Sequence, residues 1–536
     1  MNINDPSTHD PASPSGGISR RDLFKGVGAF AITTGLIGGL PLTANAATAA
    51  KPKRGGTLRV GVVGSTNDIV DGQTIVAKAD QARLMAGFET LLAFDENFKP
   101  SNKYGLAESV VGKSTTDYVI TLKKGIKFHS GKAVTADDVV YSFQRLLDAK
   151  LALPSYKALK DFIDPAQVKK IDARTVEITL LKPSVDFKST LCAYTNTIVP
   201  VGYTREGAQI GTGPYKLASF TPGRESRHVR NASYWQKGKP YFNEVVIQDF
   251  ADKPALVNAL RSGQIDAAID VPLTDIGPLS TTPGVKVNEV AGGAWLTIVM
   301  LTDKAPFNDP KVRQAMRLVI NRQEILDRAL QGHGKLGNDL FGYIDETYNA
   351  NKFAQRTQDI AKAVSLLTAA GYSKDKPLEV DLPAPDDTGG LIPMAQAFAE
   401  QAKATGGILK INAKAMDSTY WDTTYAKTPI YTSYWSPRAY LAQIGATAGY
   451  GETLYEKTNT KYNDLYVAAV GEADDAKRLA LIKQLQQFDY DDGAYIIPVF
   501  NSFADAYKDK LQGIVNRPGQ LNLDYYGRGF QELWFK

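Results

Sequence analysis

Hydrophobic and polar positions follow different periods along this chain, and each period predicts a different kind of element. The stretch from Trp295 to Leu301 is almost wholly apolar, as expected for a strand that is buried on both faces. Turn-forming residues follow from Lys304 to Pro310, and Asn308 or Asp309 is placed to cap a helix. We expect the chain to pass here from one lobe to another. An ordinary strand-to-helix connection inside one domain is the alternative.

The segment after this turn has the 3.6-residue period of an amphipathic helix. Its polar positions are occupied by Lys311, Arg313 and Arg317, which we expect on the outside of the helix. The apolar positions that predict its buried face are Val312, Ala315, Met316, Val319 and Ile320.

A different pattern occupies the region from about residue 100 to about residue 200. Tyr118 to Leu122 and Thr175 to Leu180 alternate between apolar and polar residues, as half-buried antiparallel strands do. Between them, Thr135 and Asp138 have the spacing of a helix-capping box, with an apolar helix face after them. The pattern predicts a separate antiparallel subdomain.

The rest of the first half predicts an α/β architecture. A strand from Thr57 to Val63 ends in the polar loop Ser65, Thr66 and Asn67, at the strand end where α/β proteins bind ligands. A plain loop is the alternative for these three residues. A helix is expected from Arg83 to Leu92.

A β-α-β unit follows and predicts a parallel sheet. Its parts are a strand from Glu244 to Asp249, a helix from Lys253 to Arg261, and a strand from Gln264 to Asp270. The earlier run Gly211-Thr212-Gly213 is not a nucleotide loop, because no helix begins after it and Pro214 lacks a backbone donor. We expect a rigid turn into a strand there.

Composition excludes several classes of protein. The chain has 536 residues, which is too long for one core, and its net charge of +5 is too balanced for a nucleic-acid binder. Its one cysteine, Cys192, allows no internal disulfide, and a buried inert thiol is favoured over a nucleophile. The four histidines have no metal-binding spacing, so we expect neither a metal nor a cofactor.

The N-terminus has the features of an export signal. Ser19-Arg20-Arg21 begins a segment that resembles a twin-arginine (Tat) signal, and the Gly-rich apolar run after it ends in Ala44-Asn45-Ala46. We therefore expect residues 1–46 to be a signal peptide and the mature protein to be periplasmic. A transmembrane anchor is the alternative, but the apolar run is short and broken by glycines.

Several motifs carry a family resemblance. They read LKKGIKFHSGKAVTADDVVYSF, GTGPYKL with a downstream RNASYW, ALVNALRSGQIDAAI, and PFNDPKVRQAMRLVINRQEIL. In this order they resemble the solute-binding proteins of bacterial ABC importers in the peptide, opine and nickel class. The departures are small, with Ser130 and Asn321 where the family usually has Asp.

The resemblance implies two α/β lobes joined by two hinge crossovers that close on a ligand. Lobe I would be residues 57–302, including the antiparallel subdomain, and lobe II would be residues 303–498. Residues 499–536 would return to lobe I. The implied partners are a small-molecule ligand and the membrane permease of an ABC importer, and we expect a monomer that binds no nucleic acid. In lobe II we expect helices at Ile360 to Ala370, Met394 to Ala404 and Asp475 to Phe488, a strand at Leu378 to Pro383, and a return crossover at Tyr495 to Phe500.

The ligand contacts are expected near Trp435. Peptide-binding relatives use an acidic residue in a W-x-x-D stretch to hold the ligand's amino group, but here the stretch is Tyr434-Trp435-Ser436-Pro437-Arg438. Because a buried carboxylate ligand needs a cation, Arg438 favours an opine, another organic acid or a sugar-linked metabolite over an ordinary peptide. A surface position is the alternative for Arg438. Trp295 is a candidate wall of the cleft, with core packing as its alternative.

Three alternative functions are compatible with the sequence. The favoured one is a secreted binding protein that delivers a solute and performs no chemistry. A periplasmic hydrolase would need an activated nucleophile, and the sequence has no G-x-S-x-G motif or metal motif. A binding module that serves a sensor or acts as a chaperone is the third.

Overall fold

A computed structural model describes residues 51–75, 77–386, 388–417, 419–449, 451–452, 458–515, 523 and 529–536. The expected signal peptide therefore lies outside the described residues. Within them, no helix has the length and apolar character needed to cross a membrane. Residues 51–536 form one compact unit.

One long sheet runs through both lobes, in the strand order β16-β12-β17-β11-β1-β10-β9-β8. In lobe I, β1 pairs in parallel with β10 on one side and with β11 on the other. Since helix α5 (Lys253–Ser262) connects β10 to β11, the predicted β-α-β unit is confirmed. The strands are β1 (Thr57–Val63), β8 (Tyr215–Thr221), β9 (Glu225–Arg230), β10 (Glu244–Phe250), β11 (Ala267–Ala268), β12 (Val285–Met300), β16 (Ile430–Trp435) and β17 (Tyr495–Lys508), with β13 (Gly334–Leu336) paired to β17.

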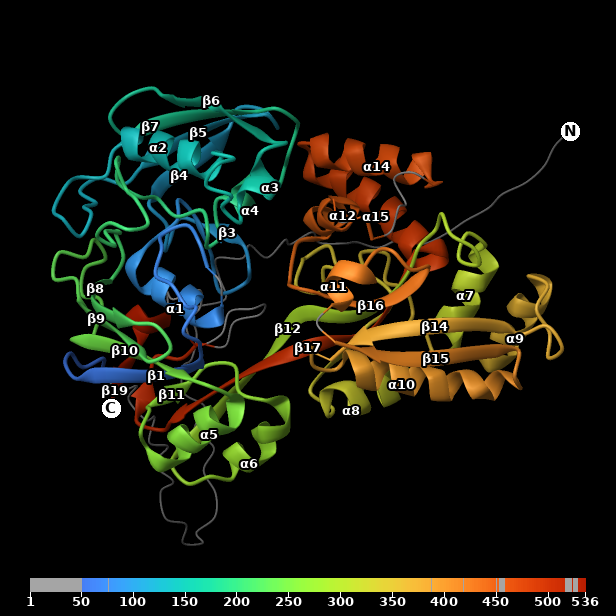
Figure 1. Ribbon diagram of the computed structural model, residues 1–536. Helices are drawn as coiled ribbons and strands as arrows, with labels where there is room; N and C mark the ends of the chain where they lie inside the picture. Colours follow the sequence, from blue (N-terminus) through green and yellow to red (C-terminus); the bar gives the residue numbers. More distant parts are fainter. Residues whose placement is uncertain are drawn as a thin grey trace, which may run out of the picture. The chain divides into compact units, whose positions relative to one another are not determined.

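The antiparallel strands β12 and β17 are the two crossovers, and Figure 1 shows them passing together from one lobe to the other. Their pairing shifts at Ala291 to Ala294, where Gly293 has a positive φ of 73° and Ile344 packs over it. At Gly292 a side chain would clash with Phe503. β12 is thus much longer than the predicted strand, and its residues from Trp295 onward pack in the core of lobe II. The lobe boundaries at 302 and 498 stay predictions.

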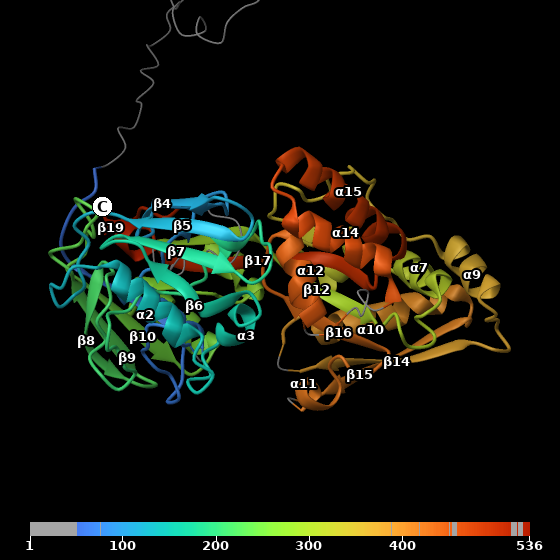
Figure 2. The same cartoon turned by 90° about the horizontal axis from the view of Figure 1, so that it is seen from above.

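The predicted antiparallel subdomain is confirmed as a four-stranded sheet with the order β4-β5-β7-β6, whose strands lie side by side in Figure 2. Thr135 and Asp138 form the predicted capping box at the start of helix α2 (Ala136–Leu146). The other elements are β4 (Ala107–Gly112), β5 (Asp117–Leu122), β6 (Ile163–Lys170), β7 (Thr175–Leu180), α3 (Tyr156–Leu159) and α4 (Phe187–Thr190).

The helix predicted from Arg83 to Leu92 is wrong in its position. Helix α1 runs from Lys78–Gly87, and Phe88 after it is extended. The carboxylate of Asp80 accepts hydrogen bonds from the backbone nitrogens of Ile69 (2.8 Å) and Ala77 (3.1 Å), which fixes the start of the helix.

The motif from Gly211 to Gly213 is a structural turn against the end of α1. A side chain at Gly211 would clash with the carbonyl oxygen of Gly87, so only glycine fits this approach. Buried Glu89 accepts hydrogen bonds from Thr212 (2.8 Å), Tyr234 (2.7 Å) and Trp235 (3.0 Å). The GTGPY and RNASYW motifs therefore hold lobe I together through one carboxylate.

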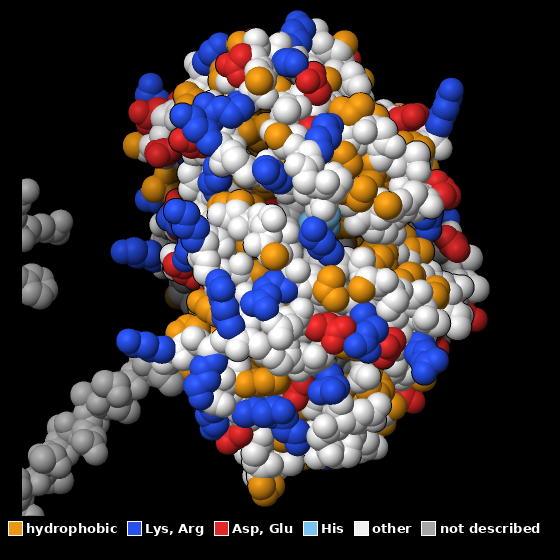
Figure 3. Space-filling view, turned by 90° about the vertical axis from the view of Figure 1, so that its left-hand side faces the viewer, with side chains coloured by type: hydrophobic (Ala, Val, Ile, Leu, Met, Phe, Trp, Pro, Cys, Tyr) orange, Lys and Arg blue, Asp and Glu red, His pale blue; other side chains and the backbone are white. Residues whose placement is uncertain are grey.

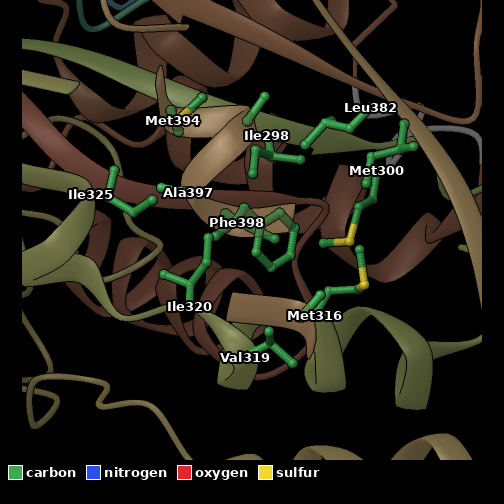
Figure 4. Close-up of a cluster of buried hydrophobic side chains, with 14 of the residues drawn as sticks. Ile298, Met300, Met316, Val319, Ile320, Ile325, Leu382, Met394, Ala397 and Phe398 are labelled. Atoms are coloured by element: carbon green, nitrogen blue, oxygen red, sulfur yellow. The ribbon is translucent and has the colours of Figure 1, made fainter. Parts of the chain in front are cut away.

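Lobe II has an aliphatic core on one face of its strands. Ile298 and Met300 of β12 meet Met316 of helix α7, and Phe398 of helix α10 fills the centre of the cluster (Figure 4). Helices and strands on this side are α7 (Pro310–Val319), α8 (Arg322–Leu330), α9 (Ile360–Ala369), β14 (Leu378–Pro385), α10 (Leu391–Ala402) and β15 (Leu409–Met416). The opposite face carries α12 (Tyr440–Gly449), α14 (Thr460–Gly471) and α15 (Asp475–Asp492), whereas α11 (Tyr420–Thr423) contacts β14.

The predicted outward positions of Arg313 and Arg317 on α7 are wrong, because both side chains are buried. Arg317 donates to the carbonyl oxygens of Tyr490 (3.0 Å), Gly493 and Tyr495 (3.1 Å). These acceptors lie at the end of α15 and the start of β17, where the helix leaves carbonyl groups without helical partners. A guanidinium with five donors satisfies several of them at once, which compensates in part for the burial of its charge. Asp309 caps α7 by accepting from the Lys311 nitrogen at 2.8 Å, as predicted.

The two lobes differ in charge. Residues 303–498 contain 22 basic and 25 acidic residues, whereas residues 47–302 and 499–536 contain 37 basic and 29 acidic residues. The outer face of lobe I shows many more Lys and Arg than Asp and Glu side chains (Figure 3). With the predicted lobe boundaries, the positive net charge of the chain lies in lobe I.

Candidate functional site

A buried cluster of aromatic side chains in lobe II lies next to lobe I. Val185 of lobe I packs against this aromatic cluster, and its backbone nitrogen donates to the Val470 oxygen of α14 at 3.1 Å. An exposed ion pair between Lys99 and Glu346, 2.5 Å long, also joins the lobes. Both views place α12 on this side of lobe II (Figure 1 and Figure 2). The buried members of the aromatic cluster include Trp295, Phe341, Tyr420, Tyr431, Trp435, Tyr440, Tyr462, Tyr495 and Phe500.

Arg438 lies at this meeting of the lobes. Its guanidinium carbon is 5.0 Å from the ring centre of Trp435, and the side chain is half-buried. Across the interface, burial raises the pKa of Tyr194, and the positive charges of Lys78 and Arg438 partly offset this rise. Arg438 is therefore close enough to lobe I for its charge to act there.

Trp435 is held in place by a residue that sequence reasoning missed. Its indole nitrogen donates to Glu452 at 2.8 Å, and Tyr495 donates to the same oxygen at 2.7 Å. The other oxygen accepts from Tyr425 (2.7 Å) and Ser433 (2.8 Å). Burial raises the pKa of Glu452, although these four donors lower it again in part. The single signal in the sequence was an acidic residue among Gly, Tyr and Thr, which alone points to no role.

Trp295 is in the core of the aromatic cluster and is 1% exposed. Its ring stacks on Phe341 with 6.0 Å between centroids and meets Tyr495 edge-on at 5.4 Å. This position matches core packing, the alternative given for Trp295. Its role toward a ligand stays a prediction.

Tyr434 points away from Arg438. Successive residues of a strand face opposite sides, so Tyr434 lies on the other face of β16 from Trp435. It is 48% exposed and meets Trp421 edge-on at 5.7 Å. The structure thus separates Tyr434 from Trp435 and Arg438, which it brings together.

Ser65, Thr66 and Asn67 form an exposed loop at the carboxyl end of β1. Ser65 donates to Asp68 at 3.0 Å, and Asp68 accepts from buried Arg83 at 2.9 Å. Thr66 lies against the turn at Gly223 between β8 and β9. These contacts hold the loop within lobe I, and ligand binding by its three residues stays a prediction.

Other chemistry has little support in the described part of the chain. It contains no group of three or more His, Cys, Asp or Glu side chains that could hold a metal ion. The Cys192 sulfur is fully buried and lies 3.4 Å from the Lys188 carbonyl oxygen. Burial lowers the pKa of His129 to about 4 and that of His228 to about 3, so both rings are neutral at pH 7.

Comparison with known proteins agrees with this geometry. The family of bacterial extracellular solute-binding proteins, family 5, matches residues 103–453 through its middle part. Heme-binding protein A of Haemophilus influenzae is 28% identical over 452 residues, which cover 77% of this chain and 81% of that protein. The periplasmic oligopeptide-binding protein OppA of Escherichia coli is 26% identical over 457 residues, with the same two coverages.

Solved structures show the same fold. The periplasmic binding protein AgaA of Agrobacterium tumefaciens R10, in complex with agropinic acid, has a TM-score of 0.69 at 24% identity. It covers 90% of this chain and 99% of its own. The ABC transporter substrate-binding protein CtaP of Listeria monocytogenes has a TM-score of 0.77 at 20% identity, covering 90% and 100%. This chain therefore belongs to the bacterial extracellular solute-binding proteins of family 5, with the two-lobed periplasmic-binding-protein fold, and serves an ABC importer as its substrate-binding subunit.

Proposed function

We propose that the solute carried by this protein bears a carboxylate group and that Arg438 binds it between the lobes. The observation that carries the proposal is the guanidinium of Arg438, which lies over the Trp435 ring and close enough to lobe I for its charge to act on Tyr194. A guanidinium offers two parallel donors that match the two oxygens of a carboxylate. Stacking on an aromatic ring fixes the plane of these donors before the ligand arrives.

The support of the Trp435 ring and the range of solutes in the family bear on the class of ligand. Glu452 accepts the hydrogen bond of the Trp435 indole N–H and so fixes the ring over which Arg438 lies. Relatives bind diverse solutes: their names specify heme, oligopeptides and glutathione, and a solved neighbour holds agropinic acid. Replacement of the family's acidic anchor by Arg438 favours an opine or another organic acid within this range. Ser65, Thr66 and Asn67 would complete the site from lobe I once the lobes close.

We further propose that the protein acts as a monomer, without catalysis, after export by the Tat pathway to the periplasm. Buried Cys192 and the two neutral histidines, His129 and His228, support binding without nucleophilic chemistry. Turnover of the bound solute, measured by mass spectrometry, would contradict the absence of catalysis. Retention of precursor in a strain without the Tat translocase tests the export route.

The test of the ligand class begins with the small molecules that copurify with the protein. We expect denaturation of the protein to release a molecule with at least one carboxylate, which mass spectrometry then identifies. Arg438→Gln should reduce its affinity by at least about 30-fold, because one partner of a desolvated charge pair is removed. Arg328→Gln is the matched control, since Arg328 is half-exposed and pairs with Glu324 on α8. A released molecule without an acidic group, or equal retention by both variants, would contradict the proposal.

A further inference from the structure

A partly open chamber of about 100 Å³ lies in lobe II, between α12, α14 and the start of β17. Four aromatic rings line it, from Phe341, Tyr462, Tyr466 and Tyr495. The carboxylate of Asp489 on α15 is the charged group among its described lining residues, and none of these is basic. Aromatic rings and a carboxylate are the groups by which proteins recognise ammonium ions.

Asp489 is buried, and its hydrogen-bond donors are neutral. One oxygen accepts from the Tyr440 hydroxyl and the other from the Tyr462 hydroxyl at 3.1 Å. No Lys, Arg or His of the described chain makes an ion pair with it; Arg317 on α7 acts on it from a longer distance. Burial raises the pKa of Asp489 to about 6, and the two hydroxyls and Arg317 oppose this rise. At pH 7 the site therefore holds a buried negative charge that Arg317 offsets only in part, which is costly unless a ligand supplies a cation.

The chamber adjoins the interface between the lobes. Burial raises the pKa of Tyr466 to about 12, and the negative charge of Asp186 in lobe I adds to this rise. Val470, one turn further along α14, accepts the inter-lobe hydrogen bond from Val185. Closure of the lobes thus covers the helix that forms one wall of the chamber.

The chamber is also linked to Arg438. Tyr440, two residues after Arg438, begins α12 and donates its hydroxyl proton to Asp489. Its ring stacks on Phe341, a wall of the chamber, with 5.0 Å between centroids. Arg438 and Tyr440, the residue that donates to Asp489, therefore belong to the same turn of chain.

We propose that this chamber is a subsite for a protonated amine of the transported solute. The inference rests on the proposed function and extends it: the solute is an amino-carboxylate, with its carboxylate on Arg438 and its ammonium group among the rings. A cavity of about 150 Å³ admits benzene, so about 100 Å³ admits a smaller head group such as a primary or methylated ammonium. The rings bind the cation with their faces, and Asp489 neutralises it.

The experiment uses n-butylammonium chloride as the probe and butan-1-ol as its neutral match, titrated at pH 7.5 and followed by NMR chemical shifts. We expect the full-length protein to bind the cation at least about 10-fold more tightly than the alcohol. Asp489→Asn should remove this difference. Tyr466→Leu should weaken cation binding by about 3- to 10-fold, whereas Tyr466→Phe, which keeps the ring, should retain it.

Asp491→Asn is the matched control, because it makes the same change at an exposed position of the same helix. Circular dichroism and the unfolding midpoint show that each variant is folded. Equal binding of the two probes by the wild-type protein, or equal cation binding by wild type and Asp489→Asn, would overturn the amine subsite. If Arg438→Gln loses the copurifying solute while Asp489→Asn retains it at wild-type affinity, the carboxylate anchor stands and the amine subsite falls.

Discussion

Lobe II buries carboxylates in two places, and it treats them in opposite ways. On the scaffold side, Asp339 contacts Arg322 at 2.7 Å and Arg356 at 2.9 Å. Burial alone would raise the pKa of Asp339, but the arginine charges outweigh it, and the pKa lies below its usual value. On the side facing lobe I, Glu452 and Asp489 accept hydrogen bonds from hydroxyl and indole groups, and burial raises both pKa values.

This difference separates groups that hold the fold from groups that are available for a ligand. The charge of a carboxylate that is paired with arginines is already neutralised and is not available to a ligand. A carboxylate that is buried with neutral donors keeps its negative charge at an energetic cost, as is frequent at functional sites. Arg438 differs from the arginines around Asp339, because its guanidinium lies over the Trp435 ring, 5.0 Å from the ring centre.

Removing the neutralised carboxylate should have the largest effect on stability. Asp339→Ala leaves Arg322 and Arg356 buried without their shared anion and removes the acceptor for the Ile497 nitrogen at 3.0 Å. We expect the free energy of unfolding, measured with urea, to fall by about 3 to 5 kcal/mol. Lys414→Ala on exposed β15, whose partner Asp381 is also exposed, is the control and should change little. A loss below about 1 kcal/mol for Asp339→Ala would contradict the difference between the arginine-paired carboxylate and those with neutral donors.

Asp489 should show the reverse behaviour with pH. Its pKa of about 6 in the folded protein exceeds the ordinary value of 3.8, so protonation of Asp489 stabilises the folded protein. This stabilisation is complete below pH 3.8 and is lost as pH rises through 6. The difference corresponds to about 3 kcal/mol. Urea unfolding at several pH values should therefore show that the free energy of unfolding of Asp489→Asn, relative to the wild type, rises by about 2 to 3 kcal/mol between pH 4 and pH 7.5. A gap between the two proteins that does not change with pH would contradict the assignment of a buried, unneutralised carboxylate.

The exposed pair between Lys99 and Glu346 should matter least. Both side chains are more than half exposed, so solvent screens their attraction. Lys99→Gln is expected to change the equilibrium between open and closed lobes by less than about threefold, measured by energy transfer between dyes on the two lobes. A larger effect would mean that lobe I is held by charge and not by the contact between Val185 and the aromatic cluster.

Elements with a strong period could be predicted from the sequence, whereas contacts across the fold could not. The capping box at Thr135 and the β-α-β unit depend on neighbours in the chain, and both were confirmed. Arg317 looked like a surface residue, because its acceptors at the end of α15 lie more than 170 residues away. Helix α7, which carries Arg317, is covered on both sides, and the charge of Arg317 alone does not reveal this.

The site shows the same limit. The family motif pointed to Trp435 and Arg438, which the structure brings together, but nothing local connected Glu452 to the Trp435 ring. Asp489 lies in a run of acidic residues near the end of α15, where its neighbour Asp491 is exposed. Only the packing of α12 and α14 distinguishes the buried carboxylate from the exposed one.

The central claim, that Arg438 binds a carboxylate of the solute between the lobes, is tested most directly by comparing the released solute with its methyl ester. Both are titrated calorimetrically into stripped wild-type protein and into Arg438→Gln. We predict that the wild type prefers the free acid by at least about 30-fold and that the variant shows no preference. Equal affinity of the wild type for acid and ester, or an undiminished preference in the variant, would contradict the claim.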